Sequence, residues 1–246
     1  MTIDGPDQLK KLKEIGAICR DVLRTMGAAV RPGVTPRELD ELGGKMLREA
    51  GAQSAPMLAY DFPGYTCISV GDAVAHGIPG DTPLEEGQLV NIDVSAEKDG
   101  VFADTGASFA VGKIAPELQK LLDATKDAQR KAMFAARAGQ PVNVVGKTVQ
   151  REANKHGFHI IEGLNGHGVG AWIHEEPTVP NLYYPSDRTK LVEGQVITIE
   201  PFLTTKSRHY VEDDDGWTLR LSEGGYGAQF EHTFVVTKGA PIVVTA

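Results

Sequence analysis

The stretch Leu84–Asp93, which reads LEEGQLVNID, decides the fold together with its counterpart Leu191–Glu200, which reads LVEGQVITIE. Five of the ten aligned positions are identical, and both stretches end in a carboxylate. Near each end, apolar residues alternate with polar ones. This alternation is typical of a strand, because successive side chains of a strand point to opposite faces. The chain therefore carries the same kind of acidic strand twice.

The elements around the two stretches also repeat, so that each half of the chain reads as two helices followed by strands. Helical spacing of apolar residues, capping residues and turn residues carry this prediction. The expected helices are about 9–30, 36–50, 116–138 and 143–155, and the expected strands lie near Thr66–Val70, Leu89–Ser95, Val101–Ala110, Gln195–Phe202, Trp217–Leu221 and Gln229–Val236. We expect one domain over residues 1–246, with halves of about 1–112 and 113–246.

The composition excludes several classes of protein. The chain has 246 residues, of which 41% are hydrophobic and 24% charged, as in an ordinary globular protein. Its net charge of −8 argues against a broad nucleic-acid-binding surface. The two cysteines, Cys19 and Cys67, cannot form a disulfide scaffold, and no apolar run approaches the length of a membrane helix. With no secretory signal at the N-terminus, we expect a cytoplasmic enzyme.

The first acidic strand has a partner whose register the turn residues predict. Asp99-Gly100 is a hairpin signal, because both residues tolerate the backbone of a two-residue turn. If these two residues form the turn, Ser95 lies opposite Asp104. Asp104 is then diagonal to Asp93 on the same face, within reach of a shared ion.

The second half offers two further carboxylates, Glu200 and Glu231, among apolar neighbours. An acid on a strand is usually an outward, solvated residue, and for any single one of these four that alternative has about even odds. Four acids that face one core would repel one another and raise each other's pKa, and two divalent cations would balance their charges. A set of four is therefore better explained by bound cations.

Histidine supplies a further ligand type. His76 and His167 are flanked by glycine, where backbone or substrate can approach closely, and His174 follows His167 by seven residues. These three histidines are candidates for ligands or substrate contacts. The other four we assign to structure or surface; they are His156, His159, His209 and His232.

Nine short motifs, taken together, resemble the type I methionine aminopeptidases of the pita-bread metallopeptidase family. They occur in that family's order over essentially the whole chain: Ser54–Pro56, Cys67–Val70, His76–Pro79, Asn91–Val94, Ala103–Thr105, Gly166–Gly170, His174–Pro177, Thr198–Pro201 and Gln229–Thr233. The resemblance implies an α+β fold with two pseudo-symmetric halves, a central antiparallel sheet and outer helices.

The resemblance also implies a dinuclear metal centre. Its ligands would be Asp93, Asp104, His167, Glu200 and Glu231, with Asp104 and Glu231 bridging. Oxygen and imidazole ligands suit cobalt, manganese, iron or zinc, and the sequence does not choose among these metals. The implied reaction is removal of the initiator methionine by hydroxide attack at this centre.

The remaining site residues are carried over from the same family. Glu200 would also relay a proton, His174 would stabilise the developing oxyanion, and His76 would contact the scissile amide. A pocket for the methionine side chain would include Phe62, Cys67, Ile173 and Trp217. The chain departs from the family pattern at Ala59, where tyrosine is frequent, and at Trp172 and Ile173. For Trp217, a place in the core is an equal alternative.

Two other functions stay open. Some pita-bread chains are non-catalytic modules that bind peptides, and others are aminopeptidases that cleave Xaa-Pro bonds. The first class typically lacks metal ligands, whereas all five are present here, and the second usually has a large additional domain. As partners we expect the N-terminal methionine of peptides and nascent chains, with no membrane and no specific nucleic acid. We expect a monomer, and leave a contact with the ribosome open.

Overall fold

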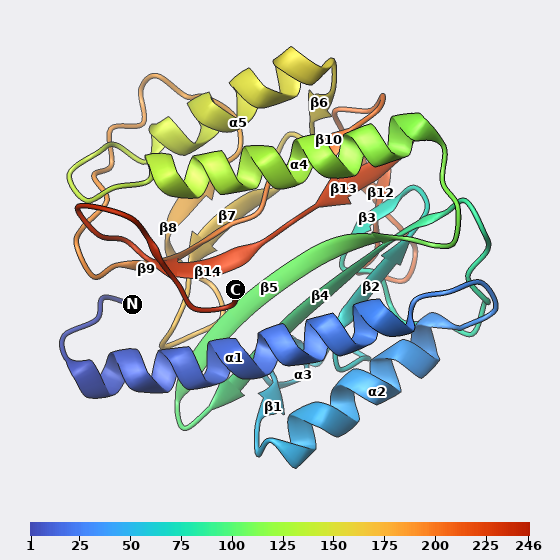
Figure 1. The fold of residues 1–246 in the computed structure, drawn as a ribbon, viewed down its shortest axis with the longest axis horizontal. Coiled ribbons are helices and arrows are strands. Elements are labelled where there is room, and N and C mark those ends of the chain that lie inside the picture. Colours follow the sequence, from blue (N-terminus) through green and yellow to red (C-terminus); the bar gives the residue numbers. More distant parts are fainter.

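Helices cover the outside of the molecule and antiparallel strands fill its interior. The computed structural model describes all 246 residues and contains five helices and fifteen strands. Two helix pairs form opposite outer layers: α1 (Pro6–Ala29) with α2 (Pro36–Glu49), and α4 (Pro116–Ala135) with α5 (Asn143–His156) (Figure 1). Every strand pairing between them is antiparallel, so the predicted α+β class is confirmed.

The first sheet is organised around β4 (Leu89–Lys98). On one edge β4 pairs with β5 (Val101–Ala110), and on the other with β2 (Cys67–Val70) and β1 (Gln53–Ser54). Asp99 and Gly100 form the turn between β4 and β5 with φ values of 52° and 77°, as a two-residue turn of this kind requires. Ser95 lies opposite Asp104, so the predicted register is confirmed.

The second large sheet belongs to the later part of the chain. Its strands are ordered β15 (Ile242–Val243), β14 (His232–Val235), β9 (Val196–Ile199), β7 (Asn165–Gly168) and β8 (Glu175–Pro180). Two small sheets complete the interior: β13 (Gly227–Gln229) with β10 (Phe202–Thr204) and β6 (His159–Ile160), and β11 (Tyr210–Glu212) with β12 (Leu219–Leu221) and β3 (Ala73–Ala75).

A seam between β5 and the segment from β13 to β14 joins the two large sheets. The N–H of Glu231 donates to the carbonyl of Gly106 at 2.8 Å, and the hydroxyl of Thr105 donates to the carbonyl of Glu231 at 2.8 Å. The N–H of Asp104 donates to Thr233 Oγ1 at 3.0 Å. Figure 1 shows β5 and β14 side by side in the middle of the molecule. The seam therefore holds Asp104 and Glu231 in the interior.

Each helix pair packs an apolar face on the strands. One buried cluster of 26 residues includes Leu12, Ile15 and Cys19 of α1, and another of 23 residues includes Leu118 and Leu121 of α4. The predicted cap of α2 is confirmed, because the side chains of Thr35 and Glu38 each accept from the other's backbone N–H. No helix combines the length and hydropathy that crossing a bilayer requires. The division into halves near residue 112 stays a prediction.

Two of the expected strands are wrong in extent. The strand expected over Gln195–Phe202 breaks at Glu200-Pro201, since proline has no N–H to donate to a ladder. The strand expected over Gln229–Val236 breaks at Phe230-Glu231, where the N–H of Glu231 turns to β5. Both breaks fall on expected metal ligands.

One further strand boundary and one short helix also differ from the sequence prediction. The strand expected from Trp217 begins at Leu219, because the N–H groups of Trp217 and Thr218 donate to the Asp215 side chain. The short helix α3 (Ala55–Tyr60) was not predicted, because six residues are too few for a periodic pattern.

Candidate metal centre

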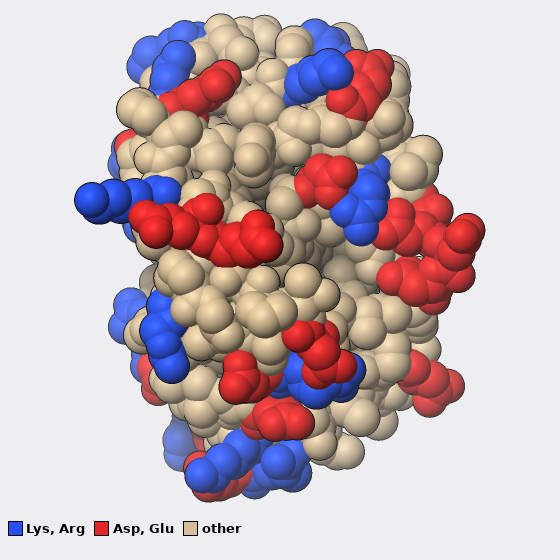
Figure 2. Space-filling model, turned by 90° about the vertical axis from the view of Figure 1, so that its right-hand side faces the viewer, with Lys and Arg blue, Asp and Glu red and all other residues tan.

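A cavity of about 800 Å³ opens between the sheets, and it gathers nearly all of the candidate site residues. The face in Figure 2 is hollowed near its middle, with acidic and basic side chains around the hollow. Glu231 does not line the cavity, but it lies beside Asp104 and His167. One potential ligand atom from each of these three residues lies within 4.8 Å of the other two. The candidates that do line it are Phe62, Cys67, His76, Asp93, Asp104, His167, Ile173, His174, Glu200 and Trp217.

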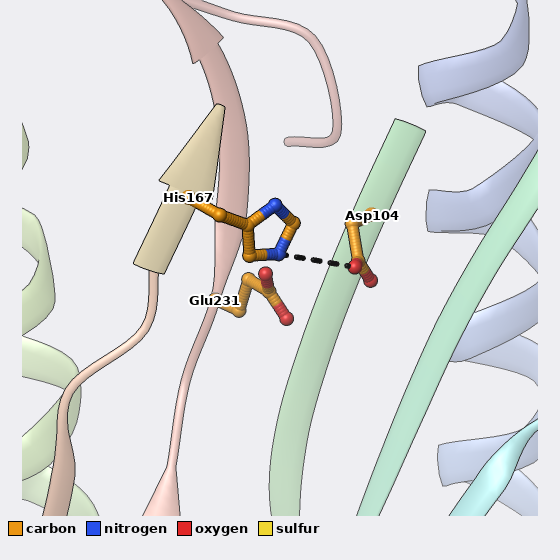
Figure 3. A group of neighbouring side chains, drawn as sticks. All are labelled: Asp104, His167 and Glu231. Carbon is orange, nitrogen blue, oxygen red and sulfur yellow. Dashed lines mark ion pairs between the residues drawn. The ribbon is translucent and has the colours of Figure 1, made fainter. Parts of the chain in front are cut away.

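Side chains from separate elements converge at the acidic end of the cavity. Figure 3 shows Asp104 on β5, His167 on β7 and Glu231 pointing toward one another. His167 Nε2 lies 3.7 Å from Asp104 Oδ2 and 3.4 Å from Glu200 Oε1. The register of β4 and β5 places Asp93 diagonal to Asp104. The structure thus brings the five expected ligands to one place.

Without cations, the charged forms of these buried carboxylates are unfavourable. Burial is the main cause that raises the pKa of Asp104, Glu200 and Glu231 well above the ordinary values, and the negative charges of the neighbouring carboxylates raise it further. Burial also raises the pKa of Asp93 to about 6. Cations bound among these groups would remove the repulsion.

Three unmet interactions indicate where cations would bind. Asp104 Oδ1 and Glu231 Oε1 are buried and have no hydrogen-bond partner. His167 Nδ1 lies 2.9 Å from the carbonyl of Gly168, which only accepts, so Nδ1 carries the proton. Burial lowers the pKa of His167 to about 3, so the ring is neutral and Nε2 presents a lone pair to the carboxylates. These donors fit divalent metal ions.

Two residues without an assigned role hold the expected ligands in place. The hydroxyl of Thr198 donates to Glu200 Oε1 at 3.1 Å and accepts from the backbone N–H of His167 at 3.1 Å. Gln229 Nε2 donates to Glu231 Oε2 at 3.0 Å. Thr198 and Gln229 each precede a ligand by two positions, and this period-2 spacing is the signal that could have found them.

The expected methionine pocket is apolar and largely buried. Phe62 and Trp217 meet edge to face, with ring centroids 5.1 Å apart, and Ile173 is fully buried beside the cavity. Trp217 lines the cavity, which favours a pocket residue over the alternative of a core aromatic. Trp172 is 44% exposed, with its ring against Phe102 at 5.2 Å, so it lies outside the pocket.

The position next to Ala59 changes the expected layout of the cavity. Ala59 packs against the core cluster of α1, while the neighbouring Tyr60 lines the cavity and reaches His174. Tyr60 Oη lies 2.6 Å from His174 Nδ1. The chain therefore contributes an aromatic side chain from the next position.

The three candidate histidines meet the cavity in different ways. Burial lowers the pKa of His76 and of His174, which favours neutral rings. His174 packs against His167 with ring centroids 4.3 Å apart. His76 has a left-handed backbone with φ of 52°, a conformation that costs free energy for residues other than glycine. Such positions persist where the surrounding structure imposes them, often at functional sites.

Glu175 supports the loop that carries Ile173 and His174. Its Oε1 accepts from the N–H groups of Ala171 and Trp172 at 2.6 and 2.7 Å. Its Oε2 pairs with the α-ammonium of Met1, which also donates to the carbonyl of Val169 at 3.3 Å. One carboxylate thus connects the loop to the first residue.

Comparison with known proteins gives a consistent result. The model of metallopeptidase family M24 matches residues 10–238. The chain is 46% identical to a methionine aminopeptidase of Staphylococcus epidermidis, with 100% of this chain and 98% of the relative covered. It is 43% identical to methionine aminopeptidase 2 of Bacillus subtilis, with 100% and 99% covered. The crystal structure of methionine aminopeptidase from Rickettsia prowazekii superimposes with a TM-score of 0.94 at 32% identity, covering both chains entirely. The predicted pita-bread fold is confirmed.

Proposed function

The chain belongs to metallopeptidase family M24, and on that premise we propose that it removes the N-terminal methionine from peptides and nascent chains. It is an aminopeptidase that depends on divalent metal, like the methionine aminopeptidases it matches over its full length. The observation that carries the proposal is the convergence of four carboxylates and one neutral imidazole at the end of a cavity with an apolar side pocket.

Two divalent ions are the proposed cofactors, held by Asp93, Asp104, His167, Glu200 and Glu231. Four carboxylates would balance the charge of two such ions, and the unpartnered oxygens of Asp104 and Glu231 would be free to bind them. When bound, two divalent ions would act as Lewis acids and would lower the pKa of water towards about 7, which would supply a nucleophile at neutral pH. The donor set suits cobalt, manganese, iron or zinc.

The proposed chemical roles of the protein's own side chains follow from their protonation and position. Glu200 lines the cavity beside His167, where its carboxylate would take a proton from the attacking water and pass it to the leaving amine. His174 is neutral and donates to the carbonyl oxygen on which negative charge develops. His76, across the same cavity, contacts the scissile amide.

The proposed specificity comes from the apolar pocket and from the charge at its end. Phe62 and Trp217 offer aromatic edges and faces, which make favourable contacts with a thioether sulfur. The acidic cluster attracts the free α-amine of the substrate, which restricts cleavage to the first residue. We propose a monomer that acts in the cytoplasm, where nascent chains emerge.

A panel of three peptides tests the proposal. The protein is stripped of metal, given Mn²⁺ or Co²⁺, and incubated with Met-Ala-Ser, Leu-Ala-Ser and Ala-Pro peptides. We expect methionine to be released while the other two peptides stay intact. Equal turnover of Leu-Ala-Ser would refute the methionine specificity, and cleavage of the Ala-Pro peptide would favour the Xaa-Pro alternative.

A variant at Glu200 distinguishes an enzyme from a binding module. Glu200→Gln keeps the size of the side chain but removes both its charge and its capacity to relay a proton. We expect at least a hundredfold loss of kcat, within the usual range for general acid–base groups, with an unchanged far-UV circular dichroism spectrum. Full turnover by this variant would refute the role of Glu200. No release of methionine by the wild type with any of the four metals would favour the module.

A further inference from the structure

Two imidazole rings lie side by side in the cavity, and each has one fixed hydrogen bond. The ring centroids of His167 and His174 are 4.3 Å apart. His167 Nδ1 bonds to the carbonyl of Gly168 at 2.9 Å, and His174 Nδ1 bonds to the hydroxyl of Tyr60 at 2.6 Å. The two rings therefore present their other nitrogen, Nε2, to the site.

The two partners require opposite tautomers. A carbonyl only accepts, so His167 carries its proton on Nδ1 and leaves Nε2 as a lone pair. A phenol is the better donor and a neutral imidazole nitrogen the better acceptor, so the Tyr60 O–H donates to His174 Nδ1. The hydroxyl of Tyr60 makes no other hydrogen bond. The proton of His174 is then on Nε2.

We propose that Tyr60 is a positioning residue that fixes the tautomer and the ring orientation of His174, so that His174 offers an Nε2–H donor to the substrate carbonyl. The proposal rests on the proposed function, because it concerns the donor of that reaction. With the proton on Nδ1 instead, His174 would present a lone pair to an oxygen that becomes negative. That arrangement is repulsive where a donor is needed.

The fold fixes Tyr60 well enough for this role. Tyr60 is the last residue of α3, a helix whose first turn is capped by the side chain of Ser54. Asp61 closes the helix in the left-handed region with φ of 56°, and its N–H donates to the carbonyl of Met57 at 3.2 Å. Tyr60 is 41% exposed, and its ring centroid lies 5.6 Å from that of His174 at the cavity wall. Loss of the hydroxyl therefore removes one hydrogen bond and little packing.

Kinetics of two matched variants provide the first test. Tyr60→Phe removes the donor and keeps the ring, and Tyr65→Phe is the control, since Tyr65 lies outside the cavity with its ring against Arg48. With Met-Ala-Ser and the Mn²⁺-loaded protein, we expect Tyr60→Phe to lower kcat about tenfold with KM within about twofold. Tyr65→Phe should match the wild type. Unchanged kcat in Tyr60→Phe would overturn the proposal.

A spectroscopic test reads the tautomer directly, without activity. In zinc-loaded protein labelled with ¹⁵N-histidine, the His174 signals are assigned by their loss in His174→Gln. We expect a pyridine-type Nδ1 and a pyrrole-type Nε2 in the wild type, and an increased population of the other tautomer in Tyr60→Phe. A pyrrole-type Nδ1 in the wild type, or identical spectra, would overturn the proposal. If the wild type does not cleave Met-Ala-Ser, the proposed function fails, while these spectra still decide the tautomer.

Discussion

Replacing a buried ligand carboxylate by its amide should stabilise the protein once metal has been removed. Glu231 is 1% exposed, and its Oε1 has no hydrogen-bond partner. The negative charges of Glu200 and Asp93 repel its own negative charge. Glu231→Gln removes that charge with little change of shape. The new amide oxygen can still accept the hydrogen bond from Gln229. We therefore expect a more stable metal-free fold that has lost a metal ligand.

The size of the effect and its pH dependence follow from the burial of the acid. A buried polar group without a partner costs about 1–3 kcal/mol, so we expect Glu231→Gln to raise the free energy of unfolding by that amount at pH 8. The pKa of Glu231 is raised in the folded state, so the acid is protonated below its ordinary value of 4.5 and the penalty is absent there. The penalty grows as the pH rises, and the gain from the variant should grow with it.

Asp93 gives the metal-free protein a second dependence of the same sign. Its pKa is about 6 in the folded state against an ordinary 3.8. At about 1.4 kcal/mol per pKa unit, this shift corresponds to about 3 kcal/mol of stability that is present below pH 4 and lost as the pH rises through 6. This contribution remains in Glu231→Gln, so the variant should reduce the loss of stability at high pH without abolishing it.

Glu152→Gln is the matched control, because the same substitution should have the opposite sign there. Glu152 is 3% exposed, but its oxygens pair with Lys131 at 2.8 Å and with Arg151 at 3.0 Å. Lys131 also pairs with Asp127, so its ammonium group lies between the two neighbouring acids Asp127 and Glu152 and neutralises their charge in part. Removing the carboxylate leaves Arg151 without this partner and leaves Lys131 paired with Asp127 alone. We expect a loss of about 1–3 kcal/mol, less than for a fully buried pair because Lys131 is partly exposed.

Denaturation with guanidinium chloride, followed by far-UV circular dichroism, measures all three proteins in excess EDTA between pH 4 and pH 8. The wild type and Glu231→Gln should converge at pH 4 and separate at pH 8. Destabilisation of Glu231→Gln at pH 8, comparable to that of Glu152→Gln, would refute the view of the site as an uncompensated acidic cluster.

In a separate measurement without EDTA, free Mn²⁺ at a hundred times its Kd should stabilise the wild type by about 2.7 kcal/mol per site and the Glu231 variant less.

Three further substitutions test the pocket and the support of the ligands. Trp217→Ala should raise KM for Met-Ala-Ser at least tenfold with a smaller change in kcat, in steady-state kinetics, because it removes one aromatic wall. Gly106→Ala would place its Cβ 2.4 Å from the side-chain oxygen of Gln229, so we expect about 1–3 kcal/mol less stability and weaker metal binding by calorimetry. Thr198→Val should lower Mn²⁺ affinity about tenfold in the same titration, because it removes the hydroxyl that holds Glu200.

The first pair of ligands could be predicted from the sequence because a local signal fixes their geometry. Asp99-Gly100 specifies a two-residue turn, and a turn of known length sets which residues of the two strands face each other. Strand alternation then puts Asp93 and Asp104 on one face. A loop one residue longer or shorter would have placed Asp93 and Asp104 on opposite faces, so the structure could have contradicted this prediction.

The positions of Glu200 and Glu231 could not be predicted in the same way, since no local sequence signal indicates which strands of the two sheets lie side by side. Glu231 reaches Asp104 only because its N–H bonds to Gly106 across the seam between two sheets. His167 arrives from a third element, β7. Before the structure, the charge balance of four acids indicated shared cations, and only the resemblance to a known family named the five ligands of one site. The contact of Tyr60 with His174 could not be predicted, because Tyr60 lies on a helix too short for a periodic pattern, although the family comparison had pointed to Tyr60 as a neighbour that compensates in part for Ala59.

The breaks that made the strand predictions wrong also explain how the site is held. Where a ladder stops at Glu200 and Glu231, the backbone groups that a neighbouring strand would satisfy must find other partners. The carbonyl of Glu200 accepts from Asn181 Nδ2 at 3.1 Å, and that of Glu231 accepts from the hydroxyl of Thr105. These partners are specific side chains, whereas any residue can supply a ladder's backbone bonds. Substitutions around the breaks should therefore disturb the position of the ligands before they disturb the sheets.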